Sequence, residues 1–165
     1  MRLKVLSLLA AVVLVAACES TPQNAGSAGA GGGATAGSAT PVRTGPAPGS
    51  QEDLVVNVGD RVFFGFDKFD LTPEARATLD RQASWLNQYP RVTVTVEGHA
   101  DERGTREYNL ALGERRANSV KNYLLARGVD ANRIATISYG KERPAVLGSN
   151  EASWAQNRRA ETVVN

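Results

Sequence analysis

Hydrophobic and polar positions alternate with two different periods in the second half of the chain. Valine recurs at every second position of residues 92–96, with threonine between, and this period of two predicts a strand that continues to Glu97. Apolar or aromatic residues recur at about every fourth position of residues 106–127, and this period predicts a long helix that ends at Gly128. Thr105 precedes the helix as its N-cap.

The rest of residues 51–165 divides into shorter segments of the same two kinds. We predict strands at 62–66, 133–139 and 162–164, and a short helix at 150–157. Another helix begins after Thr72 with Pro73 and ends before Pro90. Strands and helices therefore alternate, and this order favours an α/β domain of βαβ units whose sheet is at least partly parallel.

The first 17 residues differ in composition from everything that follows. Arg2 and Lys4 precede a run of thirteen mainly apolar residues, whereas a bilayer-spanning helix needs about 20. We therefore interpret residues 1–17 as a signal peptide. The sequence Val15-Ala16-Ala17-Cys18 is similar to a bacterial lipobox, which implies that Cys18 becomes the lipidated first residue of the mature chain.

Residues 18–50 are predicted to be a flexible tether between the lipidated cysteine and a single folded domain at 51–165. Of the 32 residues from 19 to 50, 27 are Gly, Ala, Ser, Thr or Pro, and such a composition cannot bury a core. The following 115 residues are enough for one domain with one core.

Charge and cysteine content exclude several classes of function. The whole chain carries 19 basic and 17 acidic residues, and removing residues 1–17 takes away two basic ones, leaving 17 of each. A nearly neutral mature chain has no basic excess for nucleic-acid binding. A single cysteine also excludes an internal disulfide.

The most informative charged residue is Arg116, which takes the place of a leucine in the apolar stripe of the long helix. Such a guanidinium needs an internal carboxylate or an anionic ligand when it leaves water. Asp101 lies fifteen residues earlier, before the helix N-terminus, and Asn109 projects from the same side of the helix as Arg116. One interpretation is a clamp for a zwitterion. The alternative is that Arg116 points to solvent and Asp101 belongs to an ordinary turn.

Several motifs of residues 60–160 resemble those of the OmpA-like peptidoglycan-binding domain family. They are Phe64-Gly65-Phe66-Asp67, Gly98-His99-Ala100-Asp101-Glu102-Arg103-Gly104, Tyr108-Asn109, Arg115-Arg116-Ala117, Ser138-Tyr139-Gly140 and Asn157-Arg158-Arg159-Ala160. The resemblance implies a two-layer βαβαβ-type domain, with a mixed four-stranded sheet and helices on one face.

The same resemblance implies a function and a set of site residues. The residues matching Asp101 and Arg116 hold meso-diaminopimelate of the peptidoglycan stem peptide, and those matching Asn109 and Asp67 line the same site. It further implies an outer-membrane lipoprotein facing the periplasm, with TolB and other Tol proteins as partners in drawing the outer membrane inward at division. Glu19, after the cysteine, fits the outer membrane by resemblance to enterobacterial lipoproteins. No cofactor or metal is expected.

Two positions depart from the family pattern. Ala100 stands where relatives usually have threonine, so one hydroxyl contact is missing from the binding loop. Glu161 stands where they commonly have an apolar residue, which leaves the pairing of the last strand open.

Two other functions are compatible with parts of the sequence. A peptidoglycan hydrolase would use His99, Asp101 and Glu102 as acid and base, although we interpret His99 as a loop residue bonded to the backbone. A protein adaptor would use Arg158, Arg159 and the 141–149 loop as its contact surface. These two arginines fit equally well as the solvated end of a helix.

Overall fold

The computed structural model describes residues 45–165, so the predicted signal peptide, Cys18 and most of the predicted tether lie outside the described residues. The described part belongs to one compact unit, Val42–Asn165. Its elements follow in the order α1 (Gln51–Asp53), the π-helical turn η1 (Leu54–Val58), β1 (Arg61–Phe63), α2 (Pro73–Gln88), β2 (Val94–His99), α3 (Arg106–Ala126), the 3₁₀ turn η2 (Ala131–Arg133), β3 (Ile134–Gly140), α4 (Glu151–Asn157) and β4 (Arg159–Val164). Among these helices, none is long and apolar enough to span a bilayer.

The four strands form one mixed sheet in the order β1-β4-β2-β3. β4 lies antiparallel to both β1 and β2, and β2 lies parallel to β3. The register pairs Val94 of β2 with Ile134 on one side and with Val164 on the other. The predicted α/β class and mixed four-stranded sheet are confirmed.

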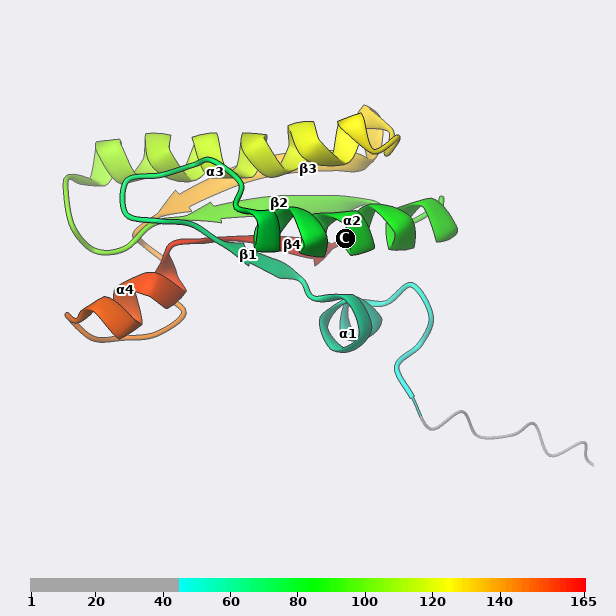
Figure 1. Cartoon of the computed structure of the whole chain (residues 1–165), viewed down its shortest axis with the longest axis horizontal. Helices are drawn as coiled ribbons and strands as arrows, with labels where there is room; N and C mark the ends of the chain where they lie inside the picture. The colour runs from blue at the N-terminus through cyan, green and yellow to red at the C-terminus, as the bar shows by residue number, and fades with distance from the viewer. Residues whose placement is uncertain (1–44) are drawn as a thin grey trace, which may run out of the picture. The chain divides into compact units, whose positions relative to one another are not determined.

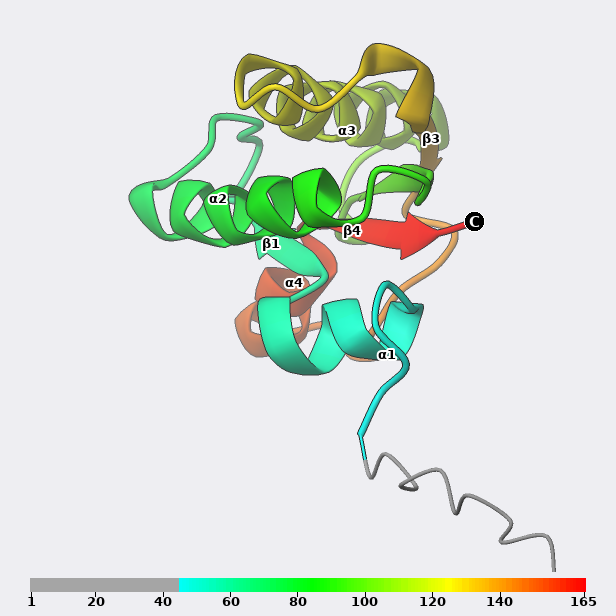
Figure 2. The same ribbon diagram turned by 90° about the vertical axis from the view of Figure 1, so that its right-hand side faces the viewer.

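Helices α2 and α3 lie on the same side of the sheet, as Figures 1 and 2 show. Both begin as the sequence predicts, with the hydroxyls of Thr72 and Thr105 accepting from backbone amides of the first turn. Between these helices and the sheet lies the buried core, whose main members are Leu79, Leu86, Val94, Val96, Val120, Leu124 and Ile134. The opposite face of the sheet carries charged side chains, among them Arg61, Glu97 and Glu161.

Helix α3 contacts β2 at Gly113. A methyl group there would lie 2.8 Å from the carbonyl oxygen of Gly98, and one on Gly98 would collide with the backbone of Gly113. These two glycines therefore allow the helix to lie directly on the strand that leads to Asp101.

The strands agree with the predictions less closely than the helices do. β1 ends at Phe63, so the predicted strand over 62–66 is too long, and Phe64 to Phe66 enter the following loop. Glu161 lies in β4 between two paired strands, where it forms ion pairs of 3.3 Å with Arg61 and 3.1 Å with Arg159. Arginine neighbours on the solvent face thus provide the partners that an apolar residue would not need.

The segment before β1 was not predicted as regular structure, and it fastens the start of the domain. We call residues 49–57 the N-terminal clasp. The carboxylate of Asp53 accepts hydrogen bonds from Gly49 N at 2.9 Å, Asn57 Nδ2 at 2.7 Å and Trp85 Nε1 at 2.9 Å. The side chain of Gln51 accepts from the backbone N–H of Val164 at 2.7 Å. Ordered contacts therefore begin before Gln51.

Candidate functional site

The loops that follow β1, β2 and β3 leave the same end of the sheet. β1 and β2 are both antiparallel to β4, so their C-terminal ends coincide, and β3 runs parallel to β2. Figure 1 shows the β1–α2 and β2–α3 connections curving toward each other beside the start of α3. Residues far apart in the sequence therefore meet there, and the site is built from two loops and one helix.

Arg116 is the central residue of this site and is completely buried. Leu112, Val120 and Leu124 continue its stripe into the core, whereas Tyr108, one turn before Leu112, is largely exposed. The guanidinium donates to three backbone carbonyls, those of His99 at 2.7 Å, Lys68 at 2.8 Å and Gly65 at 3.2 Å. The interpretation in which Arg116 points to solvent is therefore wrong.

The charge of Arg116 has only neutral partners at hydrogen-bond distance. Within residues 45–165 it forms no ion pair, and the ring of Phe64 lies 5.2 Å from its guanidinium carbon. Burial lowers the pKa of Arg116 to about 10, partly offset by the charge of Asp101, so the side chain stays cationic at neutral pH. A buried cation whose hydrogen-bond partners are neutral carbonyls favours an anion on the side that lines the cavity.

Asp101 lies two residues after the end of β2 and is 5% exposed. Arg103 approaches it most closely, with Nη2 2.6 Å from Oδ2, and Nη1 of Arg158 lies 3.5 Å from the same oxygen. Burial opposes ionisation, but the hydrogen bonds from Arg103 outweigh it and hold the pKa of Asp101 below its ordinary value. The clamp interpretation treated Asp101 as a carboxylate awaiting a cation, whereas it already has two.

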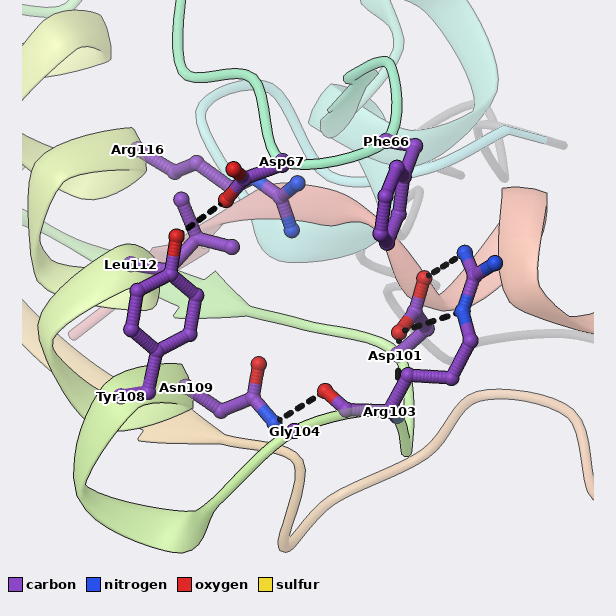
Figure 3. A pocket seen from close by; sticks show the side chains of 9 residues that line it. All are labelled: Phe66, Asp67, Asp101, Arg103, Gly104, Tyr108, Asn109, Leu112 and Arg116. Atoms are coloured by element: carbon purple, nitrogen blue, oxygen red, sulfur yellow. Dashed lines mark hydrogen bonds and ion pairs between the residues drawn. The ribbon is translucent and has the colours of Figure 1, made fainter.

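A cavity of about 270 Å³ brings these residues together. Figure 3 shows its lining, which consists of Phe66, Asp67, Asp101, Arg103, Gly104, Tyr108, Asn109, Leu112 and Arg116. All four residues that the sequence nominated, Asp67, Asp101, Asn109 and Arg116, are therefore in one wall or another of the same cavity.

The other two nominated residues provide polar groups to the cavity. Asp67 has a backbone φ of +56°, the only positive value at a non-glycine residue of the described part, and its carboxylate accepts from the hydroxyl of Tyr108. Asn109 donates its amide to the carbonyl of Arg103 at 2.8 Å, and its oxygen points into the cavity in Figure 3. The cavity thus combines one unpaired cation with two carboxylates and a carboxamide oxygen.

Sequence reasoning missed the role of Arg103 and its aromatic neighbours. The guanidinium carbon of Arg103 lies 4.1 Å from the ring centroids of both Phe66 and Trp154. Phe66 and Arg103 belong to motifs already singled out, so their position beside Asp67 and Asp101 was a usable signal. Trp154 lies 51 residues beyond Arg103 on α4, and no local pattern indicates that contact.

The hydrolase alternative is not supported by the positions of its three residues. His99 ends β2 and is 1% exposed, and neither ring nitrogen has a hydrogen-bond partner within the described part. The prediction of a backbone-bonded loop residue was therefore wrong. Burial, together with Arg159 and Arg143 nearby, lowers the pKa of His99 to about 4. Glu102 instead accepts from Trp154 Nε1 at 3.0 Å.

The adaptor alternative used Arg158, Arg159 and the 141–149 loop, and both arginines are buried. Arg158 donates to the carbonyl of Phe64 at 3.1 Å and to the carboxylate of Glu151 at 2.7 Å. Arg159 pairs with Glu161 on the face opposite the helices. Neither side chain is a solvated helix end or a free contact surface, and Arg158 belongs to the support of Asp101.

Comparison with known proteins assigns the chain to the same family as its sequence motifs do. Residues 63–158 match the OmpA family. A peptidoglycan-associated lipoprotein of Rhizobium meliloti (strain 1021) is 60% identical over 117 residues, which cover 71% of this chain and 66% of that protein. One of Brucella melitensis biotype 1 is 51% identical over 154 residues, which cover 92% of this chain and 85% of that protein.

Solved structures agree in fold. The crystal structure of the peptidoglycan-associated lipoprotein from Burkholderia pseudomallei superposes with a TM-score of 0.63 at 43% identity, covering 64% of this chain and 90% of that one. The C-terminal domain of Helicobacter pylori MotB superposes with a TM-score of 0.60 at 23% identity, covering 64% of this chain and 84% of that one. At that lower identity the similarity concerns the fold alone.

Proposed function

The chain belongs to the OmpA family and, within it, to the peptidoglycan-associated lipoproteins, and from this premise we propose that its cavity binds meso-diaminopimelate of the peptidoglycan stem peptide. Like its homologues, it is a binding protein and not an enzyme. The side-chain end of diaminopimelate is a zwitterion, with an ammonium and a carboxylate on one carbon. The cavity offers charges of both signs to match it.

One observation carries this proposal, namely the unpaired charge of Arg116. Its three hydrogen bonds go to carbonyl oxygens, and within residues 45–165 no carboxylate lies at ion-pair distance from its guanidinium, which lines the cavity. A ligand carboxylate provides that anion next to a guanidinium that is itself completely buried, where a charge-assisted bond is strong. Asp101 and Asp67 then face the ammonium, and the carboxamide oxygen of Asn109 is a further acceptor for it.

The cellular setting is part of the same proposal. The lipobox-like sequence at Cys18 gives a lipid anchor, and residues 18–50 give a tether between the outer membrane and a domain at 51–165 that binds the cell wall without a covalent bond. TolB and the other Tol proteins are the expected periplasmic partners, with the outer membrane drawn inward at division as the outcome. Replacing Cys18 with alanine tests the anchor, because continued sedimentation of the variant with outer membranes would contradict it.

Calorimetric titration with two muropeptides tests the binding site. The unit Val42–Asn165 is titrated with a stem peptide containing diaminopimelate and with an otherwise identical one containing lysine, which lacks the distal carboxylate. Losing one partner of a desolvated charge pair costs about 2 to 5 kcal/mol, so the lysine ligand should bind roughly thirtyfold to several thousandfold more weakly. Equal affinities for the two ligands would refute the role of Arg116.

A further inference from the structure

Both oxygens of the Asp101 carboxylate are fully engaged before any ligand enters. Oδ1 accepts from the backbone N–H of Arg103 at 3.1 Å and from its Nε at 3.3 Å. Oδ2 accepts from Nη2 of Arg103 at 2.6 Å and from Nη1 of Arg158 at 3.5 Å. A carboxylate has about four lone-pair sites, so none is left for a further donor. An ammonium reaches Asp101 only by replacing one of these donors.

We propose that the Arg103 side chain is an internal occupant of the ammonium position and that the ligand's ammonium displaces it from Asp101. This inference rests on the proposed function and concerns the same cavity. Of the two arginines on Asp101, Arg103 is the one that lines the cavity, and its side chain is 32% exposed, against 8% for Arg158. Arg158 is fixed by two further bonds, to Phe64 O and Glu151.

The guanidinium of Arg103 lies between two aromatic rings while it pairs with Asp101. Its guanidinium lies 4.1 Å from the ring centroids of Phe66 and Trp154, and Trp154 is itself bonded to Glu102. Figure 3 shows the Arg103 guanidinium beside the Asp101 carboxylate and the Phe66 ring above it. Stacking against aromatic rings is favourable for a guanidinium, so the two rings hold the Arg103 side chain beside Asp101 while no ligand is bound.

Displacement leaves Asp101 in position. The backbone N–H of Arg103 and Nη1 of Arg158 still hold one oxygen each after the side chain has moved. One cation replaces another, so the charge beside Asp101 is unchanged. The carboxylate end of the ligand differs, because Arg116 gains an anion that it did not have. The ligand's ammonium is thus recognised by replacing Arg103 at Asp101, and its carboxylate is recognised by forming a new ion pair with Arg116.

The experiment compares Arg103→Met with the unchanged unit Val42–Asn165. Methionine keeps apolar bulk between the two rings but has no charge for Asp101. The first ligand is the stem peptide with diaminopimelate, and the second carries 2-aminopimelate in its place, which retains the distal carboxylate but lacks the amine. A partly exposed ion pair contributes about 1 kcal/mol or less, so Arg103→Met should bind the first ligand up to about fivefold more tightly. Its affinity for the second should not increase.

The control variant is Arg106→Met, which removes an arginine that pairs with Glu142 at the surface, outside the cavity. It should leave both affinities unchanged. In the unchanged protein, the NMR resonance of the Arg103 Nε–H should shift with the first ligand and not with the second. Arg103→Met with equal or weaker affinity for the first ligand, measured against this control, would overturn displacement alone. Failure of the unchanged protein to bind either ligand would overturn the proposed function, and the displacement with it.

Discussion

The cavity and the N-terminal clasp each bury an aspartate, and their partners differ in kind. Asp53, in the clasp, is 8% exposed, and its donors within residues 45–165 are all neutral, namely a backbone amide, the carboxamide of Asn57 and the indole of Trp85. Asp101, beside the cavity, accepts mainly from the cationic side chains of Arg103 and Arg158. Both carboxylates have lowered pKa values, so their ionisation does not distinguish them.

The two carboxylates differ in whether a ligand can replace one of their hydrogen-bond donors. Two donors of Asp53 belong to the fold itself, since Trp85 is part of the core and the donor of Gly49 is a backbone N–H. The main donor of Asp101 is a side chain with access to solvent, in a cavity that also contains the unpaired charge of Arg116. A buried carboxylate with neutral, fixed donors therefore stabilises the fold, whereas one with an exchangeable cation is suited to binding.

The largest expected effect comes from Arg116→Met, on the cavity side of this comparison. It removes the cation that would pair with the ligand carboxylate, and it takes a hydrogen-bond donor from the carbonyls of His99, Lys68 and Gly65. The Gly65 carbonyl keeps one donor, the backbone N–H of Lys68 at 3.2 Å. We expect affinity for the diaminopimelate muropeptide to fall roughly thirtyfold to several thousandfold. The free energy of unfolding should also fall, by about 2 to 5 kcal/mol, so survival of an unperturbed fold is not expected.

Calorimetry and urea denaturation measure the two effects separately. Arg116→Lys retains the positive charge and serves as the matched control for stability. An Arg116→Met protein that is folded and binds with unchanged affinity would remove the basis of the proposed site.

Asp53→Ala makes the opposite change, in the clasp. It leaves the indole N–H of Trp85 buried without an acceptor, which costs about 1 to 3 kcal/mol of unfolding free energy. Muropeptide affinity should stay within about twofold of the unchanged protein, because the clasp does not touch the cavity. Urea denaturation and calorimetry check the two halves of this prediction. A large loss of affinity at unchanged stability would show that the two regions are coupled.

Acidification should affect the end of β2 and the clasp in different pH ranges. The pKa of His99, the last residue of β2, is lowered from 6.5 to about 4, mainly by burial. Between those values the unfolded chain binds more protons than the folded protein, so stability falls as the pH decreases through this range. The pKa of Asp53 is lowered by its hydrogen bonds, that from Asn57 first, so its contribution is lost only below its ordinary value of 3.8.

His99→Phe should remove the upper of these two phases. The ring nitrogens of His99 have no hydrogen-bond partner in the described part, so phenylalanine gives up no hydrogen bond and still stacks on Tyr139. Between pH 7 and about 5, the melting temperature of the variant should become nearly independent of pH. A slope as steep as that of the unchanged protein would assign the effect to another group.

The smallest expected effect is that of Gln51→Ala, which tests how far the clasp supports the sheet. The substitution removes the side-chain acceptor of the Val164 N–H and a longer bond to the carbonyl of Thr162. The loss should be about 1 kcal/mol of unfolding free energy, with faster amide exchange at Val164. Unchanged amide exchange there would mean that β4 does not depend on the clasp.

The parts of this protein that follow from nearby residues were predictable. The start of α3 at Thr105, its stop at Gly128, and the place of Arg116 in its apolar stripe all depend on residues within a few turns of one another. Asp101 and Asn109 are close enough in sequence to be assigned to the same site. The clasp was missed because its π-helical turn has no apolar repeat, and its stability comes from Trp85, 32 residues beyond Asp53.

Only the tertiary structure decided what the charged groups meet. The carbonyls of Gly65 and Lys68 lie 51 and 48 residues before Arg116, and Arg158 lies 57 residues after Asp101. The sheet order β1-β4-β2-β3 brings these segments together by placing the last strand in its interior. The spacing of apolar residues in the sequence indicates which face of a helix or strand is apolar, because the regular backbone geometry fixes the direction of each side chain locally. The partner of a buried charge depends on how those faces pack. The sequence by itself therefore identified Arg116 and Asp101 as candidates, and the packing left Arg116 without an ion-pair partner among the described residues and filled every acceptor site of Asp101.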